Sequence, residues 1–164
     1  MERRAVFNAA LRLIKEGKFH ATPLAEIAFH ANIAASTIPY FFASRQIILN
    51  DLAGEIFSEL LHLMTRSSVD EKAFEEIFFA RWNAVHDYYL EYTDVIPFME
   101  QADDMPLDAD QAIARDEYYD ELTEFFALGM DRNVIARRDP RRLAALFHES
   151  ILSAARANSR SEEE

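Results

Sequence analysis

Apolar residues recur at spacings of three and four along most of the chain, which is the pattern of amphipathic helices. Glycine and proline are scarce, and the runs of β-branched residues that favour strands are absent. We therefore predict an all-α fold. Helices are expected over residues 3–16, 23–31, 35–42, 45–66, 68–92, 110–132 and 140–158, with a short apolar segment over residues 95–101.

Residues that favour helix ends support these boundaries. Glycine and asparagine tolerate the left-handed backbone that ends a helix, whereas Ser, Thr and Asp accept hydrogen bonds from the first turn. Helix starts are expected at Thr22-Pro23, at Ser44, at the capping box Ser68–Glu71 and at Asp139-Pro140, and stops at Gly17 and Asn32.

Three short helices joined by short turns at the N-terminus are typical of a helix-turn-helix, whose third helix lies in the DNA major groove. The longer helices that follow indicate a second part. We expect a DNA-binding domain over residues 1–46, called the head, and a larger helical domain over residues 47–164, called the body.

The residues of the head resemble those of the TetR family of bacterial transcriptional regulators. The resemblance is carried by Ala21-Thr22-Pro23-Leu24-Ala25-Glu26-Ile27-Ala28, Ala31-Asn32-Ile33, Ser36-Thr37-Ile38-Pro39-Tyr40-Phe41-Phe42 and Ser44-Arg45. It implies a homodimer that binds a palindromic double-stranded DNA operator and is released by a small-molecule inducer, most often as a repressor. It also implies that the body, residues 47–164, is the ligand-binding and dimerisation domain.

The same resemblance assigns DNA contacts to six residues of the head. Ala35, Ser36 and Thr37 would face base edges, while Thr22, which we expect to cap the second helix, Tyr40 and Arg45 would reach phosphates. Pro39 departs from the family pattern and would strain a helix that began after Ala34, so a late-starting or distorted third helix is predicted.

The body offers aromatic and small residues on single helical stripes. An apolar inducer pocket could be lined by Phe78, Trp82, His86, Tyr89, Phe98, Met99 and Tyr119, although plain core packing is the alternative for each of them. A dimer interface could be formed by Leu143, Leu146, Phe147, Ser150, Ile151 and Ala154, although packing on their own domain is equally open.

Charge is distributed unevenly between the two parts. The net charge of the chain is −12, yet residues 1–50 carry six cations and three anions. The remaining residues carry 11 cations and 26 anions. This polarity indicates two parts with different partners.

Composition excludes several other classes of protein. The chain lacks cysteine, so disulfides, thiolate metal sites and thiol catalysis are excluded, and a cytoplasmic location is expected. No apolar run approaches the roughly 20 residues of a membrane span, so no membrane partner is expected. Three glycines do not build a phosphate-binding loop.

Two acidic patterns could suggest a metal-dependent enzyme. Glu59 and His62 form a single Glu-x-x-His motif where a di-iron bundle needs two. The aspartates at 103, 104, 108 and 110 lack the glycine of a calcium loop. We therefore predict a regulator with no cofactor and no catalytic site. The alternative to a DNA-binding regulator is a helical ligand-binding or interaction module that has lost DNA binding.

Overall fold

The computed structural model describes residues 2–66, 73–102 and 105–161, and within these ranges the regular structure is helical. The elements are α1 (Glu2–Lys15), the 3-10 turn η1 (Phe19–Ala21), α2 (Leu24–His30), α3 (Ile38–Phe41), α4 (Arg45–Thr65), α5 (Phe74–Glu91), η2 (Thr93–Val95), α6 (Ile96–Ala102), α7 (Ala109–Asp131) and α8 (Pro140–Ser161). The predicted all-α class is confirmed, with a helix-turn-helix followed by a helical body.

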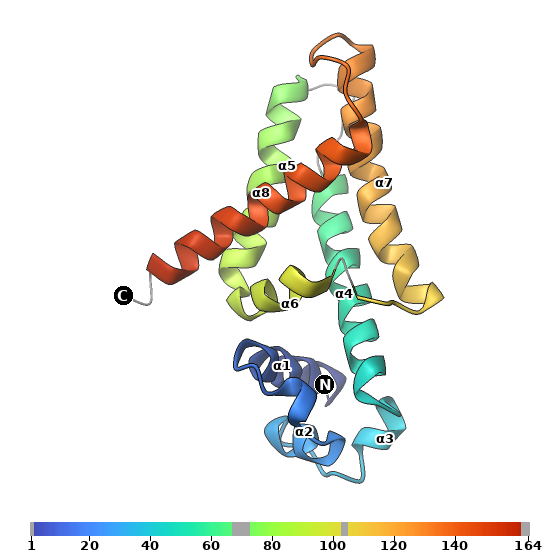
Figure 1. The fold of residues 1–164 in the computed structure, drawn as a ribbon, viewed down its shortest axis with the longest axis vertical. Coiled ribbons are helices and arrows are strands. Elements are labelled where there is room, and N and C mark those ends of the chain that lie inside the picture. Colours follow the sequence, from blue (N-terminus) through green and yellow to red (C-terminus); the bar gives the residue numbers. More distant parts are fainter. Residues whose placement is uncertain (1, 67–72, 103–104, 162–164) are drawn as a thin grey trace.

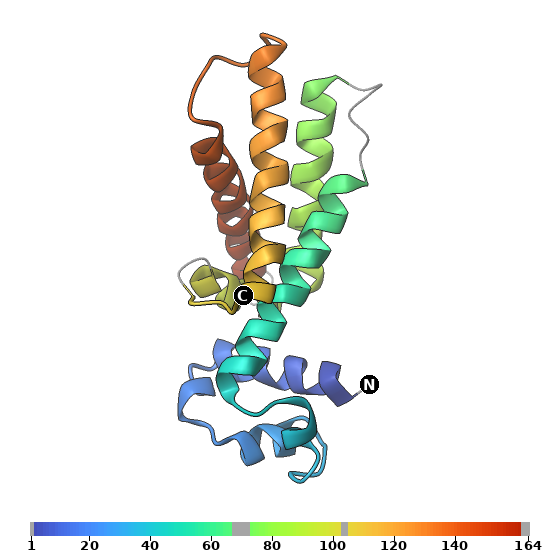
Figure 2. The ribbon, with the colours of Figure 1, turned by 90° about the vertical axis from the view of Figure 1, so that its right-hand side faces the viewer.

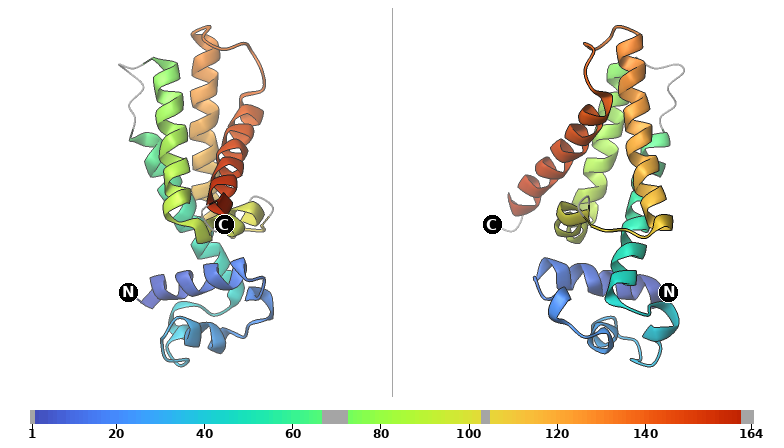
Figure 3. Two further views of the ribbon diagram at one scale, coloured as in Figure 1. Left: turned by 90° about the vertical axis from the view of Figure 1, so that its left-hand side faces the viewer. Right: turned by 45° about the vertical axis from the view of Figure 1, so that its right-hand side comes forward.

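The short helices lie at one end of the molecule and the long helices at the other. Figure 1 shows α1, α2 and α3 around the lower end of α4, which continues upward as one rod into the body. Turned by 90°, α4, α5 and α7 run side by side, with α8 next to α7 (Figure 2). The two views in Figure 3 show α8 crossing the bundle obliquely and α6 lying between the bundle and the head.

Local chemistry explains four of the predicted helix ends, at Gly17, Asn32, Ser44 and Asp139. Gly17 and Asn32 adopt positive φ angles of 69° and 56°, as expected at helix stops. The Ser44 hydroxyl accepts a 3.3 Å hydrogen bond from the Ile47 amide at the start of α4. The Asp139 carboxylate accepts a 3.0 Å bond from the Arg141 amide at the start of α8. The capping box at 68–71 lies outside the described residues.

Aromatic rings fill the core between the long helices. Phe74 of α5 stacks on Phe125 of α7 with 4.4 Å between ring centroids, and Phe78 meets Phe147 of α8 edge to face at 5.1 Å. Gly129 of α7 lies against Phe74, where a larger residue has no room: an added Cβ would be 2.4 Å from the ring. Close contacts between aromatic rings therefore hold α5 against α7 and α8.

Candidate nucleic-acid interface

The side chains of α3 divide into an inward and an outward set. Ile38 and Phe42 are buried, and the Phe42 ring lies 5.6 Å from the Phe7 ring of α1. Tyr40 lies between them in sequence and points outward, with 86% of its surface exposed. The buried pair fixes α3 on the head, so that the Tyr40 hydroxyl is presented to solvent.

The residues predicted to face DNA bases lie just before α3. Ala35 and Ser36 are exposed and Thr37 is half-buried. The Thr37 amide donates to the Ala34 carbonyl (2.9 Å), and the Tyr40 amide donates to the Thr37 carbonyl (3.1 Å). The structure thus brings Ser36, Thr37 and Tyr40 together on one short turn, and their contacts with bases and phosphates remain a prediction.

The third helix starts late, as Pro39 led us to expect. It covers only Ile38–Phe41 and has proline in its first turn, where a missing amide hydrogen costs nothing. The predicted range of 35–42 was too long at its start. The residue before the helix is Thr37, and its side chain makes no capping hydrogen bond.

The predicted capping role of Thr22 is wrong. The residue that precedes α2 is Pro23, and no side chain caps this helix. Thr22 is 7% exposed, and its hydroxyl donates a 2.9 Å hydrogen bond backward to the Lys18 carbonyl. An extended backbone at Thr22 and Pro23 directs the hydroxyl toward the preceding 3-10 turn instead of the helix that follows.

Arg45 connects the start of α4 to the turn before α2. Its Nη1 donates to the His20 carbonyl and, at 3.2 Å, to the Thr22 carbonyl. The side chain is otherwise exposed. Part of the guanidinium is therefore used to hold the head together, and its predicted phosphate contact would have to come from the remaining N–H groups.

Several other cations of the head have intramolecular partners. Arg3 lies 2.9 Å from Asp51, Lys15 lies 3.2 Å from Asp94 and Lys18 lies 2.7 Å from Glu16. The hydrogen bond and charge of Lys18 lower the pKa of Glu16, and the same contact raises the pKa of Lys18. Positive charge available to phosphates is therefore smaller than the sequence count suggests.

Two exposed aromatic residues of the head were not among the predicted contacts. Phe29 of α2 is 79% exposed and Phe41 of α3 is 39% exposed. The sequence carried a signal for Phe29, because it falls outside the buried stripe that contains Ile27 and Ala28. Exposed rings beside a nucleic-acid surface can contact sugar and thymine methyl groups.

The predicted pocket residues of α5 pack against α8. Trp82 Nε1 donates to Ser150 Oγ (3.1 Å), and the Trp82 and His86 rings stack at 4.9 Å. His86 Nε2 lies 3.1 Å from Asn158 Nδ2. Phe78 meets Phe147 in the same layer, so this stripe serves packing between α5 and α8 in the structure.

The other predicted pocket residues are divided between the core and two surface hollows. Tyr89, Phe98 and Met99 are at most 2% exposed. Phe98 reaches the floor of a hollow between α1, α4 and α6, and Tyr119 borders a groove between α7 and α8. The hollows described do not unite the predicted set, and its role as one pocket remains a prediction.

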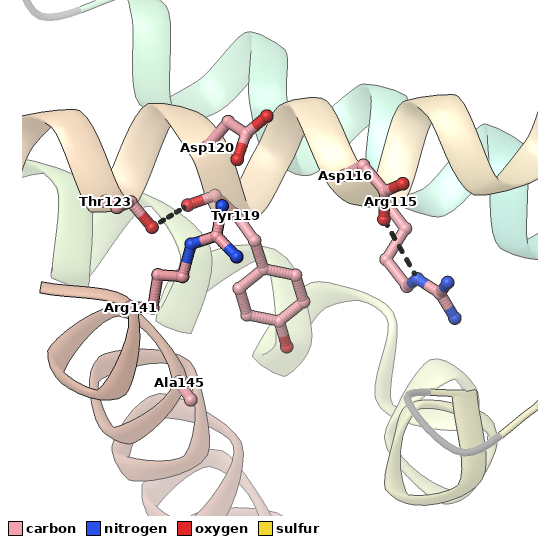
Figure 4. Close-up of a pocket in the computed structure, with 7 residues that line it drawn as sticks. All are labelled: Arg115, Asp116, Tyr119, Asp120, Thr123, Arg141 and Ala145. Atoms are coloured by element: carbon pink, nitrogen blue, oxygen red, sulfur yellow. Dashed lines mark hydrogen bonds and ion pairs between the residues drawn. The ribbon is translucent and has the colours of Figure 1, made fainter. Parts of the chain in front are cut away.

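The groove between α7 and α8 has a volume of about 570 Å³ and a mixed charge (Figure 4). Its lining residues are Arg115, Asp116, Tyr119, Asp120, Thr123, Arg141 and Ala145. Arg115 Nε lies 3.6 Å from the Asp116 carboxylate, and the Thr123 hydroxyl donates to the Tyr119 carbonyl at 2.7 Å. The two arginines and two aspartates give the groove side chains of both charges.

The predicted dimer residues on α8 do not share one exposed face. Phe147 and Ile151 belong to the core of their own chain, being 4% and 0% exposed. Ser150 is bonded to Trp82, and Leu143 and Ala154 are half-buried. Leu146 is 50% exposed and is the member of the set most open to a partner.

A buried polar cluster missed from the sequence joins three helices of the body. His148 of α8 is 1% exposed; its Nδ1 lies 2.8 Å from the Tyr118 hydroxyl and its Nε2 lies 3.5 Å from the Tyr89 hydroxyl. Burial lowers the pKa of His148 to about 4, so the imidazole is neutral near pH 7. Neutral imidazole can donate at one nitrogen and accept at the other, which suits two flanking hydroxyls.

A buried ion pair links α5 and α7 in the same body. Arg81 is 1% exposed, its Nη2 lies 2.7 Å from the Glu121 carboxylate, and its Cζ lies 4.7 Å above the Phe125 ring. Its Nε and Nη1 have no hydrogen-bond partner among the described residues. Arg81 therefore depends on Glu121 for charge compensation.

The patterns considered for a metal site do not form one in the part of the chain that the structure describes. No group of three or more potential metal-ligating side chains is found there. Asp108 instead accepts a 2.5 Å hydrogen bond from Asn50, and Asp103 and Asp104 lie outside the described residues. In the same ranges no helix is long and apolar enough to cross a bilayer.

Known structures share this fold over most of the chain. A proposed tetR family transcription regulator from Shewanella sp. PV-4 superposes with a TM-score of 0.82 at 19% identity, covering 99% of this chain and 88% of the other. The transcriptional regulator FadR from Bacillus subtilis, solved in complex with stearoyl-CoA, gives 0.78 at 15% identity, covering 98% and 89%. These similarities show the fold.

Sequence comparison identifies the family through the head. The profile of bacterial regulatory proteins of the tetR family matches residues 6–52. An uncharacterized HTH-type transcriptional regulator of Haemophilus influenzae is 23% identical over 101 residues, or 62% of this chain. This match covers 54% of that relative, about half its length. Residues 6–52 of this chain thus form a domain of the tetR family of bacterial regulatory proteins, and the fold of the remaining residues is that of solved TetR-family regulators.

Proposed function

We propose that the chain acts as a dimer that binds a palindromic DNA operator through α3 of each head and is released by a small-molecule inducer in the body. The observation that carries this proposal is the outward position of Tyr40, 86% exposed, on a helix anchored by the buried Ile38 and Phe42. Ser36 and Thr37 precede it on the same turn. In such a dimer the two recognition helices would lie about 34 Å apart, one turn of DNA.

The division into a head (1–46) and a body (47–164) leaves α4 as a continuous link. Asp51 of α4 contacts both sides: Arg3 of α1 lies 2.9 Å from one carboxylate oxygen, and Gln111 of α7 donates to the other at 3.1 Å. Asn50 donates to Asp108 just before α7. Movement of α7 in the body would thereby reach the head, which is a physical route for inducer coupling.

The inducer is a proposal supported by the fold. The FadR protein of similar fold was solved with stearoyl-CoA, so this arrangement of helices can hold an organic ligand. In this chain a ligand contacting Phe78, Trp82 and His86 would have to displace their packing on α8. Such a ligand would favour a body conformation with α8 shifted, and this would weaken operator binding.

Dimerisation is assigned to the outer face of α7 and α8. Leu146 offers exposed apolar surface, and the adjacent groove carries arginines and aspartates that a second copy can match by twofold symmetry. We expect Leu146→Glu to reduce the sedimentation coefficient to that of a monomer. Phe79→Glu, at an exposed apolar site of α5 and so outside the proposed interface, is the matched control and should leave the dimer intact.

Selection from random duplexes followed by binding assays tests the DNA contact. We expect the chain to enrich a palindrome, and Tyr40→Ala to weaken binding about tenfold or more by removing a phosphate contact. Tyr92→Ala is the control, because Tyr92 is an exposed tyrosine of the body. If no palindrome is enriched, or if both variants bind equally well, the DNA-binding proposal fails and the alternative of a helical interaction module gains support.

A further inference from the structure

A hollow of about 350 Å³ lies where the head meets the body. Its apolar floor is formed by Ile14 of α1, Leu49 of α4, Phe98 of α6 and Met105. Its rim includes Gln46 of α4 and Glu100 of α6. We call this the junction pocket; in Figure 1 it lies in the region where α6 approaches α1 and the lower part of α4.

The junction pocket takes its walls from both parts of the molecule. Ile14 belongs to the head, whereas Phe98 and Glu100 belong to the body. A ligand bound here touches both, so its affinity depends on how the head is placed against the body. By the same linkage, binding would bias that placement.

The polar side chains that line the junction pocket are His20, Gln46, Glu100 and Gln101. Gln46 Nε2 donates to Asn50 Oδ1 (2.9 Å) and to the Pro106 carbonyl (3.4 Å). Gln101 Nε2 donates to the Pro97 carbonyl at 3.1 Å. The two bonds use both N–H groups of Gln46, whereas Gln101 uses one of its two in this bond; both side chains also carry a carbonyl oxygen that can accept a hydrogen bond from a ligand.

Glu100 carries the one carboxylate among the residues that line the junction pocket, and an exposed arginine is its partner. Glu100 pairs with Arg156 Nη1 at 2.8 Å, with side chains 36% and 46% exposed. An exposed pair of this kind is weak and readily exchanged, so the carboxylate can accept a donor from a ligand.

We propose that the junction pocket binds a small hydrophobic cation, with an aromatic ring on the apolar floor and a protonated amine at Glu100. The volume lies near the lower end of the range for small-molecule sites, which suits a one-ring amine. Only one part of this inference rests on the proposed function, namely that the ligand acts as an effector of DNA binding. The binding site itself stands independently of the operator.

Calorimetry on the full chain tests the site with 2-phenylethylammonium and its neutral counterpart, 2-phenylethanol. We expect the amine to bind at least tenfold more tightly than the alcohol. Glu100→Gln should weaken the amine about tenfold and leave the alcohol unchanged. Arg156→Met frees the Glu100 carboxylate and should bind the amine as tightly as the parent or several-fold more tightly. Glu149→Gln, an exposed carboxylate outside the junction pocket, is the charge-matched control.

Gln101→Trp supplies a second test, because a bulky ring at the rim should fill the hollow and abolish amine binding while circular dichroism shows a folded chain. Equal binding of amine and alcohol, an unchanged affinity in Glu100→Gln, or no heat at all would overturn the inference. The operator selection described above is independent of these results. A chain that enriches a palindrome and ignores the amine refutes the junction site alone, whereas amine binding without DNA binding refutes the proposed function.

Discussion

Removing the carboxylate of Glu121 should destabilise the body far more than replacing its buried partner, Arg81, by methionine. Arg81 is 1% exposed, whereas the Glu121 side chain is 29% exposed. Glu121→Ala would leave a buried guanidinium without a counter-ion, and losing one partner of a buried pair costs about 3–5 kcal/mol. We expect a loss near the lower bound, because partial exposure of this site admits some solvent.

Arg81→Met has opposing effects that nearly cancel. It removes the 2.7 Å ion pair and the contact with the Phe125 ring, the latter contributing about 1 kcal/mol. It also removes the buried charge and the donors Nε and Nη1, which have no partner among the described residues. Glu121 can then be hydrated, so the net change should stay within about 1 kcal/mol.

Equilibrium urea unfolding of both variants and the double variant, at one protomer concentration, measures these changes. The double variant should be more stable than Glu121→Ala, because it no longer buries an uncompensated charge. Glu117→Ala, at an exposed site on the same helix, should stay within about 0.5 kcal/mol of the parent. The reasoning is refuted if Glu121→Ala lowers the free energy of unfolding by less than about 1 kcal/mol, or if Arg81→Met lowers it as much as Glu121→Ala does.

Three further predictions concern stability. Gly129→Ala should lower it by about 1–3 kcal/mol in urea unfolding, since the added Cβ would lie 2.4 Å from the Phe74 ring; an unchanged midpoint would contradict this packing. Burial lowers the pKa of His148 to about 4. Between pH 6.5 and pH 4 the imidazole is therefore protonated in the unfolded chain and neutral in the folded chain. Stability should fall by about 3 kcal/mol between pH 6.5 and 4, and His148→Gln should lose that share of the pH dependence. Ser44→Ala should lower the free energy of unfolding by about 1 kcal/mol, because it removes the hydrogen bond from the Ile47 amide. An unchanged free energy of unfolding would contradict this role of the cap.

Helix ends set by local chemistry were predictable from the sequence. Ser44, Asp139, Gly17 and Asn32 act where their side chains or backbone preferences indicated, because each effect involves only neighbouring residues. The late start of α3 followed from Pro39 for the same reason. Thr22 failed as a cap because the backbone of the turn before it offered its hydroxyl a different acceptor.

Features that depend on distant partners were not predictable. Arg81 and Glu121 are 40 residues apart, and nothing in their neighbours marks the pair as buried. The aromatic stripe of α5 is equally consistent with a pocket or a core, since both need apolar side chains at helical spacing. Its packing on Ser150 and Phe147 became visible only with α8 in place. The exposed position of Tyr40 on α3, opposite the buried Ile38 and Phe42, is what its predicted contact with DNA requires.

Footprinting of the chain on its selected duplex tests the central claim most directly, because it reports where the heads lie on DNA. The account predicts two protected segments centred about one helical turn apart, weakened by salt and lost with Tyr40→Ala. A single protected segment, protection that is insensitive to salt, or a footprint unchanged in Tyr40→Ala would contradict it.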